Sequence, residues 1–406
     1  MGHRSPLLLP ILGWFLAIPG AAESGVALGL DLTLEASAGL SGGNRRGQAF
    51  HGLALGRVEW TQAGRDPQGL LCRAYGSVLV LAGRGPTGAF LGDFLAASNM
   101  EGLSGTRLYA SWLEAGRPGW SLRGGALLAD EEFAGTEGGG DFLNSAFGWP
   151  PFLSANTVNT GPAFFLPALG LRFERAWGET VIWRTGVYDG DTFDSPTGDP
   201  AMNRHGARFQ VGGEQGWFAI SEATFAAARI PVRGKIGLWM HSANFGDVRD
   251  DANGRPFAIT GASPRQHSAN YGVYVAIERR PAGRPDQAGR TEIFLRCGAA
   301  PRDRNAIGWA VDAGVSRTGL LPGRPADVVA LGVAHATFGS HYAESARLAD
   351  PSIPVPDYEQ VVEASYTLKL SEQWSLQPDL QYIRHPGGSS GYGDALVFLL
   401  RANVSY

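Results

Sequence analysis

Many segments of this chain alternate apolar and polar residues, and this alternation restricts the fold more than any other feature of the sequence. Residues 28–35 read LGLDLTLE, so every second residue is a leucine and the residues between are small or polar. Successive side chains of a β-strand point to opposite faces, and such a segment therefore forms a strand with one apolar face and one polar face. Because the chain also has 58 glycines and no long helical pattern, we expect an all-β fold.

The alternation recurs to the end of the chain and predicts sixteen strands. In two of them, 51–62 and 214–226, the pattern does not decide which residues share a face. The predicted strands are residues 26–38, 51–62, 69–82, 106–116, 119–130, 167–176, 180–190, 214–226, 234–245, 269–280, 290–300, 306–318, 326–338, 358–369, 374–384 and 394–406.

The connections between these strands are mostly short at one end and long at the other. Turn-like connections such as Arg117-Pro118 and Ser371-Glu372 follow even-numbered strands, whereas longer ones such as residues 39–50, 82–106 and 131–167 follow odd-numbered strands. An even strand count with short turns at one end and long loops at the other is typical of a transmembrane β-barrel.

A water-soluble β-sandwich would show the same alternation, but the predicted strands are too long for it. Sandwich strands usually run about five or six residues, whereas a strand that spans a bilayer needs about 9 to 11. Most of the predicted strands are of the longer kind. Their apolar faces also carry aromatic residues near strand ends, where an interfacial girdle is expected: Trp60, Trp120, Trp177, Phe225, Trp374 and Tyr406.

The first residues read as a secretory signal. Arg4 gives a positive start, residues 7–18 are apolar, and Gly20-Ala21-Ala22 is a small-residue cleavage site. A membrane-spanning helix needs about 20 apolar residues, and the apolar run is shorter. We therefore expect a signal peptide at 1–22 and a single barrel domain at 23–406, exported to the outer membrane of a Gram-negative bacterium.

One segment, Glu131–Pro167, does not fit the strand pattern. It reads EEFAGTEGGGDFLNSAFGWPPFLSANTVNTGPAFFLP, which is too long, too rich in glycine and too interrupted by proline to be a strand or a regular helix. Long loops are usually functional or disordered, and this one carries more aromatic surface than a solvated tail does. We expect it to fold into the barrel and narrow the channel.

The polar faces of the strands would line a water-filled lumen of mixed charge, with residues such as Arg73, Glu278, Arg296 and Glu363. Sugars bind to such surfaces, because aromatic rings match the apolar face of a pyranose while planar polar groups pair with neighbouring hydroxyls. The loop rings either pack against the wall or stack on a ligand, and packing is the commoner role. From residue type and position, the candidate sugar-binding residues include Asn144, Trp149, Asn156, Tyr188 and Trp239.

Several stretches resemble the carbohydrate-selective porins of the OprB family. They occur in the family's order over nearly the whole chain, and they read SNMEGLSGTRLYASWLEAG (98–116), DFLNSAFGWPPFLSAN (141–156), GVYDGD (186–191), NYGVYVAIE (270–278), GLLPGRPADVVALGVAHATF (319–338) and SLQPDLQYIRHPGG (375–388). The resemblance implies a sixteen-stranded outer-membrane barrel that passes mono- or oligosaccharides passively. It further implies that arginines and acidic groups on the wall help to narrow the channel, placed here at Arg123, Arg172, Glu174 and Arg184.

No motif predicts a catalytic centre or a cofactor, and the chain is not expected to be an enzyme. Residues 387–391 read GGSSG and match the nucleophile-elbow pattern, but they connect two strands rather than a strand and a helix. Asp189, Asp191 and Asp194 are weak candidates for a calcium site, because their spacing fits no EF-hand loop. The formal net charge of −4 argues against a nucleic-acid partner, whose protein footprint is basic.

The expected partners are sugars in transit, outer-membrane lipid and, through the last strand ending at Tyr406, the barrel-assembly machinery. The oligomeric state is left open between a monomer and a homotrimer. A second function also stays open, because a barrel with a sugar-lined interior would equally serve as a non-conducting or export-linked component of a polysaccharide system.

Overall fold

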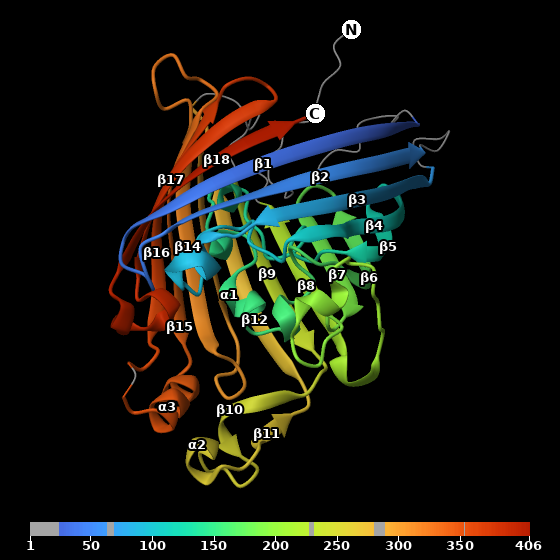
Figure 1. Cartoon of the computed structure of the whole chain (residues 1–406). Coiled ribbons are helices and arrows are strands. Elements are labelled where there is room, and N and C mark those ends of the chain that lie inside the picture. Colours follow the sequence, from blue (N-terminus) through green and yellow to red (C-terminus); the bar gives the residue numbers. More distant parts are fainter. Residues whose placement is uncertain (1–23, 63–68, 227–230, 280–288, 353) are drawn as a thin grey trace.

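The structure, a computed structural model, describes residues 24–62, 69–226, 231–279, 289–352 and 354–406. Sixteen strands pair in chain order and antiparallel, and β1 pairs with β18 to close the sheet into a barrel (Figure 1). They are β1 (Gly25–Ser41), β2 (Gln48–Gln62), β3 (Leu71–Gly83), β4 (Gly105–Arg117), β5 (Trp120–Leu127), β6 (Ala168–Trp177), β7 (Val181–Asp189), β8 (Trp217–Ala226), β9 (Val232–His241), β12 (Asn270–Arg279), β13 (Thr291–Ala299), β14 (Ile307–Thr318), β15 (Val328–Phe338), β16 (Tyr358–Lys369), β17 (Trp374–Arg384) and β18 (Ala395–Ser405).

All sixteen predicted strands are present, and the predicted closed barrel is confirmed. The prediction of a long connection at residues 39–50 was wrong, since β1 continues to Ser41 and β2 begins at Gln48. Strand pairing continues beyond the alternating residues because it depends on backbone hydrogen bonds, which need no apolar and polar pattern. The Gly39 N–H, for example, donates to the Gly47 carbonyl at 2.9 Å. The signal peptide predicted at 1–22 lies outside the described residues.

The connections differ at the two ends of the barrel, which are called here the short-turn end and the long-loop end. At the long-loop end, β10 (Phe245–Asp251) and β11 (Pro264–His267) form a separate two-stranded sheet. This sheet, α2 (Phe257–Thr260) and α3 (Ser340–Ala349) project beyond the barrel, whereas α1 (Pro151–Ser154) lies within it (Figure 1). Among the described residues, no helix has the length and apolar character needed to cross a membrane.

The leucine faces of the strands point outward, as the alternation predicts. Leu28 and Leu34 are 80% and 53% exposed, while Asp31 and Glu35 between and beside them are buried in the interior. Interior charges also link the seam of the barrel, because the Arg401 Nε on β18 donates to Glu35 Oε2 on β1 at 2.7 Å. The apolar outer band therefore faces lipid, and the polar residues face inward.

The structure settles the two ambiguous strand phases. On β2, Phe50 and Trp60 are exposed on the outside and Leu55 is buried inside; on β8, Trp217 is outside and Phe218 is inside. The aromatic girdle predicted near the strand ends is present on the outer face, and it has two rims. Exposed members at the short-turn end are Trp60, Trp177, Phe225 and Trp374, and those at the long-loop end are Trp217, Tyr271, Trp309 and Tyr382.

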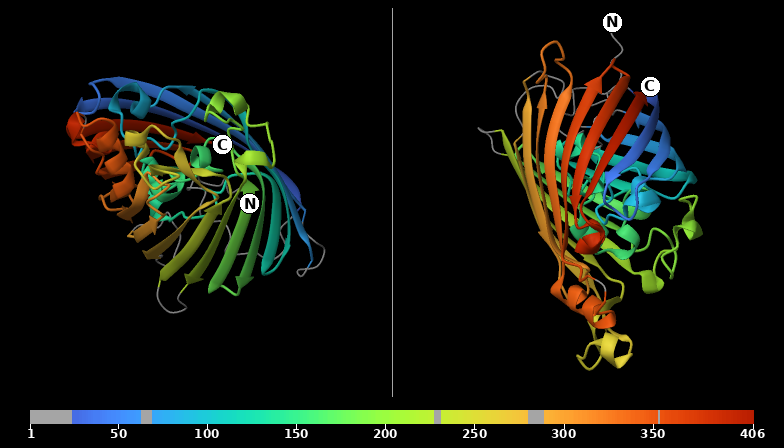
Figure 2. Two further views of the ribbon diagram at one scale, coloured as in Figure 1. Left: turned by 90° about the horizontal axis from the view of Figure 1, so that it is seen from below. Right: turned by 60° about the vertical axis from the view of Figure 1, so that its left-hand side comes forward.

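Two connections from the long-loop end return into the barrel. They are residues 128–167, called here the inner loop, and residues 84–104, called the second inner segment. Viewed from the long-loop end, both lie within the ring of strands (Figure 2). Among the described residues, the inner loop contributes five of the fourteen buried aromatic residues of the apolar cluster, including Phe142, Phe147 and Phe152.

Placing a charge on the outer band should destabilise the barrel. We expect Leu331→Arg, on the outward face of β15, to lower the free energy of unfolding by about 2–4 kcal/mol, since an arginine within the hydrocarbon loses its hydration. Urea unfolding in lipid vesicles measures this cost. Leu321→Arg is the control, because Leu321 is equally apolar and half exposed but lies in a turn; equal effects of the two changes would contradict a lipid-facing β15.

Candidate channel constriction

Arg296 of β13 holds three backbone carbonyls of the inner loop. Its Nη1 donates to the carbonyl oxygens of Ala134 at 2.5 Å and Gly148 at 2.9 Å, and its Nη2 donates to that of Ala146 at 2.8 Å. Its Nε pairs with Asp312 of β14 at 2.9 Å, and the whole side chain is buried. Buried carbonyls need a hydrogen-bond donor, and a wall arginine supplies it at three points of an irregular chain.

Glutamates of the wall do the converse and accept hydrogen bonds from backbone N–H groups of the inner loop. Glu222, Glu278 and Glu363 come from β8, β12 and β16, so the anchors are spread over a wide arc of the barrel. The bonds are Ala134 N–H to Glu222 (2.9 Å), Glu137 N–H to Glu278 (2.9 Å), Leu143 N–H to Glu363 (2.5 Å) and Asn144 N–H to Glu363 (3.1 Å). The inner loop is thus fixed against the wall along much of its length.

The two predicted amides, Asn144 and Asn156, are buried anchors of the same kind. Asn144 Nδ2 donates to Gln381 of β17 at 3.0 Å, and its Oδ1 accepts from the Ala146 N–H at 3.0 Å. Asn156 Nδ2 donates to the Ile307 carbonyl of β14 at 2.9 Å. The polar atoms of both side chains therefore form hydrogen bonds within the protein.

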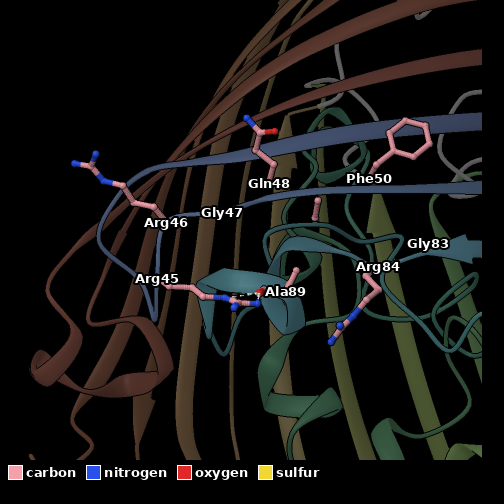
Figure 3. Close-up of a pocket in the computed structure, with 9 residues that line it drawn as sticks. Arg45, Arg46, Gly47, Gln48, Phe50, Gly83, Arg84 and Ala89 are labelled. Atoms are coloured by element: carbon pink, nitrogen blue, oxygen red, sulfur yellow. Dashed lines mark hydrogen bonds between the residues drawn. The ribbon is translucent and has the colours of Figure 1, made fainter.

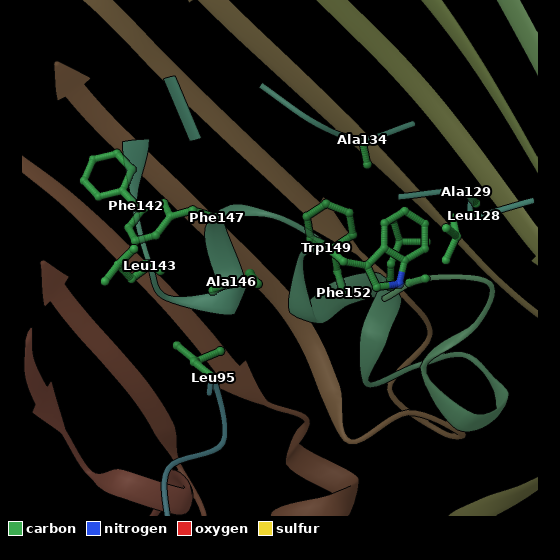
Figure 4. Packing of buried hydrophobic residues seen from close by; sticks show 14 of the residues in the cluster. Leu95, Leu128, Ala129, Ala134, Phe142, Leu143, Ala146, Phe147, Trp149 and Phe152 are labelled. Carbon is green, nitrogen blue, oxygen red and sulfur yellow. The ribbon is translucent and has the colours of Figure 1, made fainter. Parts of the chain in front are cut away.

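The rings of the inner loop pack on one another (Figure 4). They also fill gaps that glycines leave in the wall. Phe142 and Phe147 stack with ring centroids 4.3 Å apart, and both lie over Gly332 of β15. A Cβ at Gly332 would come within 2.8 Å of both rings. Trp149 is also largely buried and donates its Nε1–H to the Thr160 carbonyl at 2.8 Å. Wall packing is thus the role that these rings have in the structure.

The predicted arginines Arg123 and Arg172 share two carboxylates. Arg172 Nη2 lies 2.7 Å from Glu114 of β4 and its Nε lies 2.6 Å from Glu132 of the inner loop. Arg123 Nη2 and Nη1 lie 2.9 Å from the same two carboxylates, and its guanidinium sits 3.8 Å above the Trp112 ring. Two wall arginines thus tie the start of the inner loop to β4, β5 and β6.

The two adjacent glutamates of the inner loop have opposite pKa shifts. Burial raises the pKa of Glu131 to about 8, and the neighbouring Asp130 carboxylate adds to the effect. Burial also acts to raise the pKa of Glu132, but the attraction of Arg123, Arg172 and Arg184 outweighs it and leaves the pKa below its ordinary value. Glu132 is therefore held as the charged partner of the arginines, and Glu131 favours its protonated form.

The remaining predicted residues divide into an accessible ion pair and buried aromatic residues. Arg184 Nε lies 2.5 Å from Glu174, and these side chains stay 17% and 11% exposed. Tyr188 and Trp239 are almost completely buried on the wall, on either side of Phe218, whose ring centroid lies 6.1 Å and 6.5 Å from theirs. Of the nine predicted residues, Arg184 and Glu174 are the pair whose side chains keep the most exposed surface.

The weak calcium candidates accept hydrogen bonds from their own loop and, at Asp191, from the Asn159 amide of the inner loop at 2.7 Å. Asp191 accepts from the backbone N–H groups of Phe193 (2.9 Å) and Ser195 (3.0 Å), and Asp189 accepts from the Gln215 amide at 2.7 Å. Within the described part of the chain, no group of three or more His, Cys, Asp or Glu side chains is arranged to hold a metal ion.

Sequence reasoning did not place the second inner segment inside the barrel. Glu359 of β16 accepts from the N–H groups of Phe94 and Leu95, both at 2.7 Å. The segment also pairs with the inner loop, because the Asn99 N–H donates to the Leu143 carbonyl at 2.7 Å. The apolar residues of this segment, such as Phe94 and Leu95, were the sequence signal that could have placed it inside the barrel.

Removing the Arg296 side chain should release the middle of the inner loop. We expect Arg296→Met to leave three loop carbonyls and Asp312 without their donor, which costs roughly 3–5 kcal/mol when a buried ion pair is broken. Hydrogen exchange of residues 134–148 should become faster. The double change Arg296→Met with Asp312→Leu separates loop release from the effect of an unpaired carboxylate; unchanged exchange in both would show that Arg296 does not hold the loop.

The start of the inner loop should loosen as the pH rises. The protonated Glu131 favours the docked loop, so its contribution is complete below its ordinary pKa of 4.5 and is lost as the pH rises through about 8. Hydrogen exchange of residues 130–136, corrected for the intrinsic pH dependence, should reveal this change. Glu131→Gln should flatten the profile. Glu132→Gln should instead loosen the segment at neutral pH, because it removes a charged partner; a pH dependence that survives Glu131→Gln would contradict the assignment.

Comparisons with known proteins agree with this architecture. A family model described as carbohydrate-selective porin, OprB family, matches residues 57–406. Porin B of Pseudomonas aeruginosa is 24% identical over 190 residues, which cover 44% of this chain and 42% of that protein. The match to this curated relative therefore spans less than half of its length.

Two solved structures show the same fold. The high-pH structure of Pseudomonas putida OprB aligns over 94% of both chains with 19% identity and a TM-score of 0.83. The outer membrane channel DcaP of Acinetobacter baumannii aligns over 94% of this chain and 97% of its own, with 11% identity and a TM-score of 0.57. Since the family model covers most of the sequence and the closed barrel agrees with it, this chain belongs to the carbohydrate-selective porins of the OprB family.

Proposed function

We propose that this chain is an outer-membrane channel for the passive diffusion of mono- or oligosaccharides, and that the inner loop narrows it. The observation that carries the proposal is the anchoring of residues 134–148 to β8, β12, β13 and β16 inside a closed sixteen-stranded barrel. Sixteen strands enclose more space than wall side chains alone fill, so a loop fixed across that space sets the width of the passage.

The charge pattern of the interior supports sugars as the substrate class. Arginines and carboxylates alternate on the wall, as in the network of Arg123, Arg172 and Glu114, so neither sign of small ion is favoured strongly. Guanidinium and carboxylate groups pair with neighbouring hydroxyls of a sugar. Among the predicted residues, Arg184 and Glu174 are the ones we assign to sugar contact, because they retain exposed surface.

We assign the other seven predicted residues to positioning. Asn144, Asn156 and Trp149 hold the inner loop, and Arg123 and Arg172 fix its first residues. Tyr188 and Trp239 form part of the wall against which it rests. Their polar groups would come within reach of a sugar only if the inner loop moved.

The cellular context forms part of the same proposal. Residues 1–22 act as a cleaved signal peptide, and the last strand, ending at Tyr406, is read by the barrel-assembly machinery. In barrels of this class the short turns face the periplasm and the long loops face outward. The barrel works as a monomer or a homotrimer, and as a channel rather than an enzyme.

Deleting residues 140–160 should widen the passage. We expect the single-channel conductance in planar bilayers to rise severalfold and the block of current by added sugars to weaken. The matched control is deletion of residues 245–267, a segment of similar length that projects beyond the barrel (Figure 1). Unchanged conductance after the first deletion would show that the inner loop does not set the width. A wild-type barrel without any conductance would instead favour the export-linked role.

A further inference from the structure

Exposed arginines lie at both ends of the barrel. At the long-loop end, an open hollow of about 590 Å³ is lined in part by Arg46 and Arg84, but these two side chains point away from each other (Figure 3). They do not converge on one ligand. At the short-turn end, by contrast, Arg279 of β12 and Arg317 of β14 both donate a hydrogen bond to Thr291 of the strand between them, β13.

These two arginines lie on the outer face of the barrel. Each of them ends an outward row of exposed apolar side chains, in which Ile277 precedes Arg279 on β12 and Val315 precedes Arg317 on β14. Thr291 begins the corresponding outward row of β13. The three polar residues are therefore neighbours at the edge of the lipid-facing band, and they are called here the arginine rim.

Both guanidinium groups of the arginine rim are held beside one residue. The Arg279 Nη1 donates to the Thr291 carbonyl at 3.0 Å, and the Arg317 Nη1 donates to the Thr291 hydroxyl at 2.9 Å. Strand pairing fixes the backbone below these contacts, because Thr291 lies opposite Arg317 and Ile293 lies opposite Arg279. Two positive charges are thus brought together from opposite sides of Thr291.

The described part of the protein does not neutralise these charges. Neither Arg279 nor Arg317 forms an ion pair with a described residue, and both are exposed. The adjacent carboxylate of Glu292 is on the other face of β13, where the Arg290 Nε lies 2.6 Å from it. A guanidinium has five N–H donors, and each arginine of the rim uses one of them on Thr291. Since like charges repel each other, an anion shared between the two would stabilise the pair.

The place of the arginine rim in the membrane selects this anion. In barrels of this class the short turns face the periplasm, so the rim lies at the inner leaflet of the outer membrane. Phospholipid headgroups are the groups directly beyond the hydrocarbon of that leaflet, and each of them carries a phosphate. Guanidinium groups bind phosphate oxygens through paired hydrogen bonds.

We propose that Arg279 and Arg317, held on either side of Thr291, bind the phosphate of an inner-leaflet phospholipid between them. The acyl chains of the same lipid lie along Ile277 and Val315 of the outer band. The site depends on the membrane orientation given above but not on sugar passage, so it goes beyond the proposed function.

Native mass spectrometry of the full-length, detergent-solubilised barrel tests this site. The probe is phosphatidylglycerol, compared with diacylglycerol of the same acyl chains, which lacks the phosphate, and with glycerol phosphate, which lacks the chains. We expect Arg279→Gln with Arg317→Gln to weaken phosphatidylglycerol binding at least about tenfold, which corresponds to roughly 1.4 kcal/mol. The control, Arg46→Gln with Arg302→Gln, removes the same charge from two exposed arginines at the long-loop end.

The outcomes separate a membrane lipid from other occupants. Loss of phosphatidylglycerol adducts in the Arg279 and Arg317 variant alone supports the proposal. Equal binding of diacylglycerol would show that the phosphate is not recognised, and equal loss in the control would show that only the total charge matters. Full competition by glycerol phosphate would assign the rim to a free phosphate compound. Each of these three results would overturn the phospholipid site. Retained heat-resistant migration on gels shows that the variants are folded.

Discussion

The need to give every buried backbone group a hydrogen-bond partner controls the construction of this protein. Within the hydrocarbon, the strands of the wall can pair all their backbone groups only if the sheet is closed. The pairing of β1 with β18 closes the sheet. The inner loop has the same need but no regular structure with which to meet it. Charged side chains of the wall take over: Arg296 gives hydrogen bonds to three carbonyls, and Glu363 receives them from two N–H groups. The interior charges thus act first as structural partners of a loop.

The sequence pattern was sufficient for the strands because each bilayer-spanning strand has to keep one face apolar over its whole length. It failed where the interior is apolar as well. Leu55 on β2 and Phe218 on β8 point inward and are buried among apolar side chains, so the inward faces of these strands mix apolar residues with polar ones such as Glu222, and the alternation is weak there. Glu114 was missed for a different reason. A β-bulge between Ser77 and Val78 shifts the register along β4, so that Tyr109 and Glu114 both point inward although the alternation separates them.

The chemical types of the site residues could be predicted, but their partners could not. Amide, guanidinium and aromatic groups were expected around the inner loop, and they are found there. Asn144, however, bonds to Gln381, which lies 237 residues further along the chain. Such a contact follows from how the loop is threaded through the barrel, and no local pattern encodes it. For the same reason the second inner segment, whose anchor Glu359 is similarly distant, was identified only as a long connection.

The two segments inside the barrel are joined to each other as well as to the wall. The Asn99 N–H donates to the Leu143 carbonyl, and the Ser145 N–H donates to the Ala96 carbonyl, so each segment completes the hydrogen bonding of the other. Neither can leave its place without exposing unpaired groups on its companion. Their rearrangement is therefore cooperative, as in other contiguous units that open together. Displacing such a unit would therefore change the current through the barrel in discrete steps instead of gradually.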